Sequence, residues 1–319
     1  MRLDHWTKNV FVLPGFAVAL SMSPKLATLS TLINLAIGLL ATCLVCSSNY
    51  VINELLDAPF DRLHPTKSRR PAACEQVIPG LAYVQWLALM IAGVSIAIAV
   101  SKPLAGSLFV LWVMGCVYNI RPLRSKDVPY IDVLSEAINN PLRMLAGWYI
   151  VNPPAASPPA SLLISYWMVG AYFMGIKRYA EYRQIGDGIR AAKYRKSFAF
   201  YTEQRLIVSI MFYASTAMLF LGAFIMRYRL ELILAVPLVA WVMAVYLHLG
   251  FMPDSAVQSP EKLHREPLLM AAVCSCALLM AVLFFVRVPI LYQLFAPTAP
   301  TAPSVAPPVG GESISRSVE

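Results

Sequence analysis

Long apolar segments separated by short polar loops constrain this chain more than any other feature. The apolar windows cover the ranges 9–22, 28–56, 80–100, 104–120, 131–151, 161–180, 205–226, 231–250 and 267–296. A helix of about 20 apolar residues spans the hydrocarbon core of a bilayer. Hydrophobic residues make up 58% of the chain and charged residues only 13%, whereas soluble domains carry about 25% charged residues. The sequence therefore predicts an all-α polytopic membrane protein with about nine transmembrane helices.

The distribution of basic residues predicts the orientation in the membrane. If the windows alternate across the bilayer, 19 of the 26 Lys and Arg residues lie on one side, in the N-terminus and the loops 57–79, 121–130, 177–205 and 251–266. By the positive-inside rule we expect an integral protein of the plasma membrane with a cytoplasmic N-terminus and an external C-terminus. The net charge of +9 is assigned to topology and to an anionic substrate, and no nucleic acid is expected as a partner.

The remaining organisation is simple. Residues 297–319 are rich in Pro, Ala and Ser and lack apolar periodicity, which predicts a disordered tail after a membrane domain over 1–296. The six cysteines lie mostly inside apolar windows and are expected to pack as small hydrophobic groups. The four histidines are scattered, so no histidine-based metal site is predicted.

Acidic residues stand at the end of the second apolar window. Asn53 and Asp57 are four residues apart and share one face of a helix, and Asp61 extends that face unless Pro59 ends the helix first. Carboxylates at the end of a membrane helix are costly unless a cation neutralises them. Mg²⁺ fits because it prefers hard oxygen ligands and is commonly held by one or two carboxylates together with substrate phosphates.

The loop that follows is basic. Lys67 and Arg70 suit a diphosphate group bound beside the metal. The alternative is that Asp57 and Asp61 are solvated loop residues that pair with Arg62 and Lys67. Both interpretations stay open at this point.

A second polar stripe interrupts the fifth window. Asp132, Glu136 and Asn140 recur at intervals of four, and Arg143 lies about one turn further along the same face. Such a stripe in a span rich in Ile, Leu and Val should line a polar cavity, with Pro141 bending the helix there. A structural ion pair between Glu136 and Arg143 is the alternative.

Two acidic clusters on one membrane face, each beside a basic loop, indicate a two-metal or metal-bridged diphosphate site. The basic loop 177–205 begins with Lys177 and Arg178 at a helix end, where they are placed to hold a second phosphate. For most of that loop a topogenic anchor or a contact with anionic lipid explains the charge equally well.

These motifs resemble those of the UbiA superfamily of intramembrane prenyltransferases. That family pairs N-D-x-x-D-x-x-x-D with Y-x-x-x-P-x-x-x-K and a later D-x-x-x-D. Here the first motif reads N-E-L-L-D-A-P-F-D over 53–61, and the second matches Tyr118, Pro122, Lys126, Asp132 and Glu136. The resemblance covers about residues 6–290. It departs from the pattern at Glu54 and Glu136, which keep the charge but lengthen the side chain.

The resemblance implies a nine-helix bundle with a central cavity open to lipid and a Mg²⁺-dependent active site at the cytoplasmic face. It implies metal ligation and catalysis by Asp57, Asp61, Asp132 and Glu136, with Asn53 as a further metal ligand. Substrate contacts are expected of Lys67, Arg70, Tyr118, Lys126, Asn140, Arg143, Lys177 and Arg178.

The expected activity is transfer of an isoprenoid group from a diphosphate donor to an acceptor. The alternative is phosphoribosyl transfer from phosphoribosyl pyrophosphate to a polyprenyl phosphate. Residues 6–9 (W-T-K-N), 61–71, 177–181, 195–197 and 201–202 resemble the decaprenyl-phosphate phosphoribosyltransferase branch. A membrane terpene cyclase is a less favoured version of the enzyme. A transporter is also less favoured, since the acids lie near one face under basic loops. The expected partners are an isoprenoid lipid, a small co-substrate and membrane lipid, and homo-oligomerisation stays open.

Overall fold

The computed structural model describes residues 3–62, 67–151, 157–253, 255–258 and 260–295, and these form helices and turns without a strand. The α-helices are α1 (Leu13–Met22), α2 (Leu29–Asp61), α3 (Pro79–Val100), α4 (Lys102–Asn119), α5 (Ile131–Ala137), α6 (Asn139–Ile150), α7 (Ala160–Ile185), α8 (Gly188–Tyr194), α9 (Glu203–Tyr228), α10 (Val236–Gly250), α11 (Pro267–Phe285) and α12 (Pro289–Leu294). Short 3-10 helices join them, and η1 (Leu3–Val12) precedes α1. The predicted all-α class is confirmed.

Local sequence signals set several helix ends. Thr28, Ser101 and Thr202 begin α2, α4 and α9, and each side chain accepts a hydrogen bond from the backbone N–H three residues on. At the other end of α7, Gly186 adopts a φ of 69°, the left-handed conformation that glycine adopts without strain. These helices therefore begin and end at residues whose local conformation favours a helix end.

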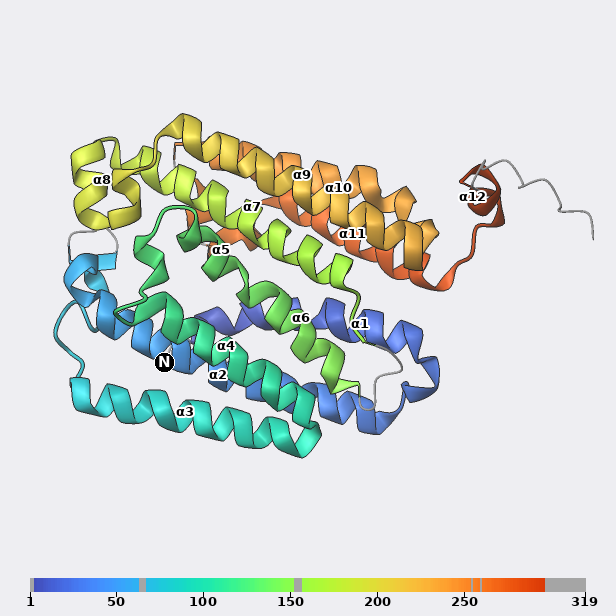
Figure 1. Cartoon of the computed structure of the whole chain (residues 1–319), viewed down its shortest axis with the longest axis horizontal. Helices are drawn as coiled ribbons and strands as arrows, with labels where there is room; N and C mark the ends of the chain where they lie inside the picture. Colours follow the sequence, from blue (N-terminus) through green and yellow to red (C-terminus); the bar gives the residue numbers. More distant parts are fainter. Residues whose placement is uncertain (1–2, 63–66, 152–156, 254, 259, 296–319) are drawn as a thin grey trace, which may run out of the picture. The chain divides into compact units, whose positions relative to one another are not determined.

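The helices of Met1–Val286 form two groups (Figure 1), and of the two apolar cores one lies mainly in the first group but also includes residues of α9 and α11. In one group α2 packs along α3 and α4, while α1 and α4 pack on α6. In the other, α7 packs along α9 and α10 packs on α11. The short α5 lies between the groups and contacts α4, α6 and α7, so the polar residues it carries are placed where the two groups meet.

The predicted fifth span is broken into two helices. α5 ends at Ala137 and α6 begins at Asn139. Pro141 has no N–H to donate to the carbonyl of Ala137, so the regular helical ladder is interrupted there. The interruption falls at Ile138, three residues before Pro141, where the sequence predicts a bend.

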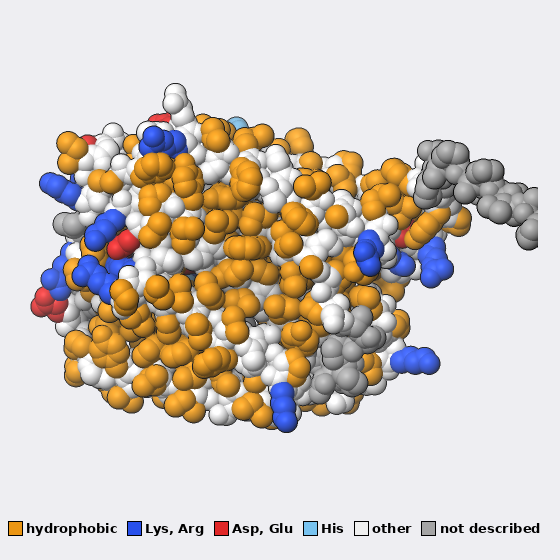
Figure 2. Space-filling model, viewed as in Figure 1, with side chains coloured by type: hydrophobic (Ala, Val, Ile, Leu, Met, Phe, Trp, Pro, Cys, Tyr) orange, Lys and Arg blue, Asp and Glu red, His pale blue; other side chains and the backbone are white. Residues whose placement is uncertain are grey.

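The outer flank of the bundle is apolar. α3 exposes Leu81, Val84 and Ile91, and α9 exposes Val208 and Leu219. Figure 2 shows apolar side chains over the middle of the molecule and most Lys and Arg side chains near its ends. This pattern is typical of a protein whose flank faces lipid.

Five helical segments of the described chain are long and apolar enough to cross a membrane: Leu29–Asp61, Pro79–Val100, Glu203–Tyr228, Leu230–Gly250 and Pro267–Phe285. Each of the nine predicted windows contains at least one helix, but the remaining ones are shorter, broken or more polar. An integral membrane bundle is supported, and nine crossings stays a prediction.

Contacts divide the chain into Met1–Val286 and Arg287–Glu319. The described part of the second unit carries α12. The predicted tail 297–319 lies outside the described residues, so the boundary expected at residue 296 stays a prediction.

Candidate active site

The end of α2 presents three carboxylates to a cavity, those of Glu54, Asp57 and Asp61. α2 continues through Pro59 to Asp61, so Asn53, Asp57 and Asp61 follow one another at intervals of four along one helix face. All three line the same cavity, which has a volume of about 170 Å³. The predicted stripe of the first motif is therefore formed, and Pro59 does not end it.

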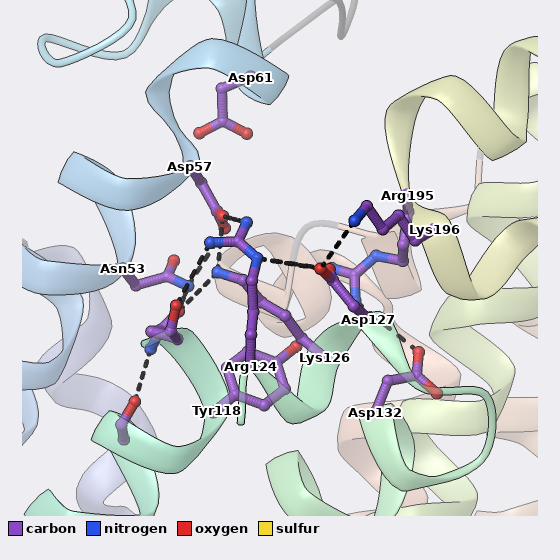
Figure 3. Close-up of polar contacts among 12 residues, drawn as sticks. Asn53, Asp57, Asp61, Tyr118, Arg124, Lys126, Asp127, Asp132, Arg195 and Lys196 are labelled. Atoms are coloured by element: carbon purple, nitrogen blue, oxygen red, sulfur yellow. Dashed lines mark hydrogen bonds and ion pairs between the residues drawn. The ribbon is translucent and has the colours of Figure 1, made fainter. Parts of the chain in front are cut away.

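Two cations from the loop after α4 neutralise Asp57 (Figure 3). Lys126 Nζ donates to Asp57 Oδ1 at 2.6 Å, and Arg124 Nη2 donates to the same oxygen at 3.0 Å. Lys126 Nζ also donates to Asn119 Oδ1 at 2.6 Å, and Asn53 Nδ2 donates to that oxygen too. Burial lowers the pKa of Lys126 to about 8, and the Asp57 carboxylate limits this fall by favouring the ammonium form.

Asp61 has a cation of its own. Arg70 Nη1 donates to Asp61 Oδ2 at 2.8 Å, and both residues line the cavity. The structure therefore joins Arg70 to the first motif, as expected. Lys67 belongs to the 3-10 turn Lys67–Arg69, but its side chain lies outside the described residues.

Asp132 was expected among the metal ligands, and the structure places it behind the cavity wall. Its side chain is fully buried and does not line the cavity. Tyr201 Oη donates to Asp132 Oδ1 at 2.6 Å, and Ser197 Oγ donates to Oδ2 at 3.1 Å. Arg178 Nε donates to Oδ2 at 3.3 Å, and Arg195 Nη1 pairs with the same oxygen at 3.7 Å.

The C-terminal half of α7 holds Arg178 in a buried network. Arg178 donates to Glu181 Oε2 at 3.1 Å and to the hydroxyl of Tyr118 at 3.2 Å. Tyr194 from α8 donates to Glu181 Oε1 at 3.0 Å, and burial together with that carboxylate raises its pKa far above the usual range. The Tyr194 hydroxyl therefore stays protonated, and it helps to fix Glu181 beside Arg178.

The break between α5 and α6 changes which members of the second stripe reach the cavity. Glu136, Asn139 and Arg143 line it, whereas Asp132 and Asn140 do not. A Cβ built on Gly170 of α7 would lie 2.1 Å from the Asn140 amide nitrogen, so Asn140 packs against α7. The predicted spacing assumed an unbroken helix, and the break at Ile138 moves the polar face by one position.

Arg143 ties the N-terminal segment to the bundle. Its Nε donates to Asn9 Oδ1 at 3.1 Å, and its Nη2 lies 3.5 Å from Cys46 Sγ. In the described part of the chain Arg143 makes these contacts instead of an ion pair with Glu136. The segment that carries Asn9 also brings His5 and Lys8 to the cavity.

The carboxylates of this cavity fit a metal ion whose coordination shell is completed by substrate oxygens. The part of the chain that the structure describes contains no group of three or more His, Cys, Asp and Glu residues arranged to hold a metal ion. Asp57 and Asp61 supply two carboxylates on one wall. Mg²⁺ commonly takes one or two carboxylates and fills its remaining positions with water and substrate phosphate oxygens.

Some lining residues were not expected from the sequence: His5, Lys8, Asn119, Arg124, Asn139 and Arg195. Arg124 reaches Asp57 across 67 positions of the chain, and no spacing rule indicates that contact. Arg195 belongs to a segment whose likeness to a known branch is visible in the sequence. That likeness was the available signal for it.

Several curated relatives of this chain are decaprenyl-phosphate phosphoribosyltransferases. A decaprenyl-phosphate phosphoribosyltransferase of Corynebacterium glutamicum is 28% identical over 63% of this chain and 58% of its own length. Proteins of the same name from Mycolicibacterium smegmatis and Mycobacterium tuberculosis are 27% and 29% identical over 65% of this chain. The matched region thus spans only about three fifths of the length of these relatives, 58% and 62% for the first two.

The fold is similar to that of solved UbiA structures, and a family model matches the sequence. A UbiA homolog from Archaeoglobus fulgidus bound to DMAPP and Mg²⁺ superposes with a TM-score of 0.65 over 89% of this chain and 99% of its own, at 19% identity. The same homolog bound to GPP and Mg²⁺ gives a TM-score of 0.64 over 86% of this chain and 99% of its own, at 18% identity. The model of the UbiA prenyltransferase family matches residues 9–273. The chain belongs to the UbiA prenyltransferase family.

Proposed function

We propose that this protein is a Mg²⁺-dependent membrane transferase that cleaves a diphosphate donor in the cavity. One observation carries the proposal. Asp57 and Asp61 line the same side of the cavity, and each forms an ion pair with a basic side chain that could instead bind diphosphate oxygens. Mg²⁺ bound there would screen the diphosphate and make it a better leaving group.

The paired cations stabilise the aspartates before the donor binds and can contact the diphosphate once it is bound. Without donor, Lys126 and Arg124 neutralise Asp57, and Arg70 neutralises Asp61. Asp57 and Asp61 would hold the metal, and these three cations would then be available to the diphosphate oxygens. They then take up the negative charge that develops as the C–O bond breaks.

We further propose phosphoribosyl pyrophosphate as the donor and a polyprenyl phosphate as the acceptor. The cavity is lined mainly by polar side chains, and its basic members are Lys8, Arg70, Arg143, Lys177, Arg178 and Arg195. That lining suits a sugar carrying two anionic groups better than a hydrocarbon chain. The names of the curated relatives agree with this assignment.

The reaction needs no general base. The bond from the ribose C1 to the diphosphate oxygen breaks, and a bond from C1 to an acceptor phosphate oxygen forms. The acceptor is already an anion, so no proton is removed, and pyrophosphate leaves with the bonding electrons. Lys177 of α7 lines the cavity and would hold the 5-phosphate or the acceptor phosphate, while Arg178 beside it would contact the diphosphate.

Prenyl transfer from a prenyl diphosphate is the second candidate. The family model and the solved homolog bound to DMAPP or GPP favour it. In that reaction departure of the diphosphate leaves an allylic cation, which an electron-rich acceptor captures. The same aspartates and cations would serve both donors.

The test measures pyrophosphate release by the purified protein in detergent with Mg²⁺, in two mixtures. One contains phosphoribosyl pyrophosphate with a polyprenyl phosphate, and the other contains prenyl diphosphates with aromatic acceptors. Asp57→Ala is the blank. Release confined to the first mixture supports phosphoribosyl transfer, release confined to the second supports prenyl transfer, and release in neither refutes the transferase proposal.

We place the cavity at the cytoplasmic face, as the distribution of basic residues predicts. Cys74 is exposed in the loop between α2 and α3, close in the chain to Arg70. A membrane-impermeant maleimide should label Cys74 in inside-out vesicles and spare it in right-side-out ones. Cys74→Ser removes the signal, and the opposite labelling pattern would contradict the orientation.

A further inference from the structure

We propose that Asp132 is a positioning residue, which holds Arg178 and Arg195 on the cavity wall as diphosphate-binding cations, and that it does not ligate the metal. This inference rests on the proposed diphosphate site. It assigns diphosphate binding on the side of the cavity that Arg178 and Arg195 line to their two guanidinium groups, instead of to a second metal ion.

Both oxygens of the Asp132 carboxylate already accept hydrogen bonds. Tyr201 donates to Oδ1, and Ser197 and Arg178 donate to Oδ2. Arg195 Nη1 adds an ion pair to Oδ2 at 3.7 Å, without a hydrogen bond. The residue is fully buried, so a metal ion would have to displace two cations and two hydroxyls to reach it.

The two arginines, unlike Asp132, face the cavity. Both line it, and Arg195 also lines a small adjoining hollow of about 30 Å³ together with Asp57 and Asp61. Arg195 Nη1 is buried and makes no hydrogen bond among the described residues. A guanidinium with a donor to spare, beside the two aspartates, is suited to bind phosphate oxygens.

The energetic role of Asp132 follows from the burial of these cations. The side chains of Arg178 and Arg195 are 4% and 15% exposed. Two such guanidinium groups repel one another, and removing a partner from a buried ion pair is strongly destabilising. Asp132 lies within ion-pair distance of both, so it offsets their charge and fixes their orientation.

Asp132 also orders the segment that carries Arg195. Ser197 and Tyr201 belong to the polypeptide between α8 and α9, and both donate to the Asp132 carboxylate. Tyr201 Oη in addition accepts a hydrogen bond from the backbone N–H of Tyr130, next to α5. The carboxylate therefore joins α5, α7 and this segment at one point.

The experiment separates metal binding from anion binding by using two probes that need no turnover. Inorganic pyrophosphate binding is measured calorimetrically in EDTA, and Mn²⁺ binding is measured by electron paramagnetic resonance at saturating pyrophosphate. The variants are Asp132→Asn and Asp57→Asn. The matched control is Asp187→Asn, because Asp187 is an exposed N-cap of α8 and asparagine caps helices equally well.

We expect Asp132→Asn to weaken metal-free pyrophosphate binding about tenfold or more while changing the Mn²⁺ dissociation constant less than twofold. Asp57→Asn should do the reverse, weakening Mn²⁺ binding at least about tenfold and leaving metal-free pyrophosphate binding equal or tighter. Asp187→Asn should match the wild type in both assays. A loss of bound Mn²⁺ in Asp132→Asn with unchanged metal-free pyrophosphate binding would overturn the proposal.

Tyr201→Phe provides a gentler variant if Asp132→Asn does not fold. It removes one donor from the carboxylate and leaves the charge in place. A metal ligand relieved of a competing donor would bind Mn²⁺ more tightly, whereas a positioning residue would lose pyrophosphate affinity severalfold with Mn²⁺ unchanged. Because neither probe requires catalysis, a protein that shows these shifts but turns over neither donor would refute the proposed function alone.

Discussion

Replacing Gly147 of α6 by alanine should separate the N-terminal segment from the bundle. A Cβ at this position would lie 1.9 Å from the carbonyl oxygen of Val12 and 2.8 Å from the backbone nitrogen of Phe16. Both atoms belong to backbone, so α6 and the N-terminal segment must move apart by about 1 Å to reach a 3.0 Å contact. Overpacking of this kind costs about 1–3 kcal/mol.

The movement also reaches the cavity. α6 carries Arg143, which donates to Asn9 of the N-terminal segment at 3.1 Å. A hydrogen bond to a charged group contributes about 1.5–3 kcal/mol, so its loss adds to the packing cost. We therefore expect Gly147→Ala to lower the free energy of unfolding by about 2.5–6 kcal/mol. We also expect kcat/KM to fall, because His5 and Lys8 leave the cavity wall with the segment.

Gly106→Ala is the matched control for Gly147→Ala. Gly106 lies in α4, and a Cβ built there meets nothing within 4 Å. Alanine in place of glycine within a helix is favourable by up to about 1 kcal/mol, so this variant should be as stable as the wild type or slightly more so. Thermal unfolding in detergent and steady-state kinetics check both variants. If Gly147→Ala unfolds at the same temperature as Gly106→Ala, the close packing of α6 on the N-terminal segment is refuted.

Three further predictions concern the site. Asp57→Asn should lower kcat at least about a thousandfold in steady-state assays, since about 4 kcal/mol of metal-dependent charge stabilisation is lost. The control Glu75→Gln changes an exposed ion pair and should leave kcat unaltered. Tyr118→Phe removes an acceptor of Arg178 and should lower kcat/KM roughly tenfold, with an unchanged value excluding that contact. EDTA should abolish turnover and excess Mg²⁺ should restore it, whereas turnover that persists in EDTA would exclude a metal-dependent site.

The sequence predicted the helices better than the spans. Apolar windows locate helices because burial in lipid or protein requires runs of apolar residues. They do not show where such a run is interrupted, and the break at Ile138 depends on the missing N–H of Pro141 and on packing against α7. Hence the fifth window was predicted correctly in extent but wrongly as one helix.

The site was predictable where its residues follow one another on a single regular helix. Asn53, Asp57 and Asp61 share a face because α2 stays helical, so spacing alone was sufficient. Asp132 and Asn140 were assigned by the same rule, and neither lines the cavity because the second stripe crosses a break. Contacts across the bundle, such as Arg124 with Asp57, depend on tertiary structure that local patterns do not encode.

The most direct test of the account follows the fate of the transferred group. The purified protein is incubated with Mg²⁺, a polyprenyl phosphate and phosphoribosyl pyrophosphate labelled in the ribose, and both lipid-extractable label and released pyrophosphate are counted. The account predicts equal amounts of the two products and none of either with Asp57→Asn. Pyrophosphate without lipid-bound label, or transfer that persists in Asp57→Asn, would contradict it.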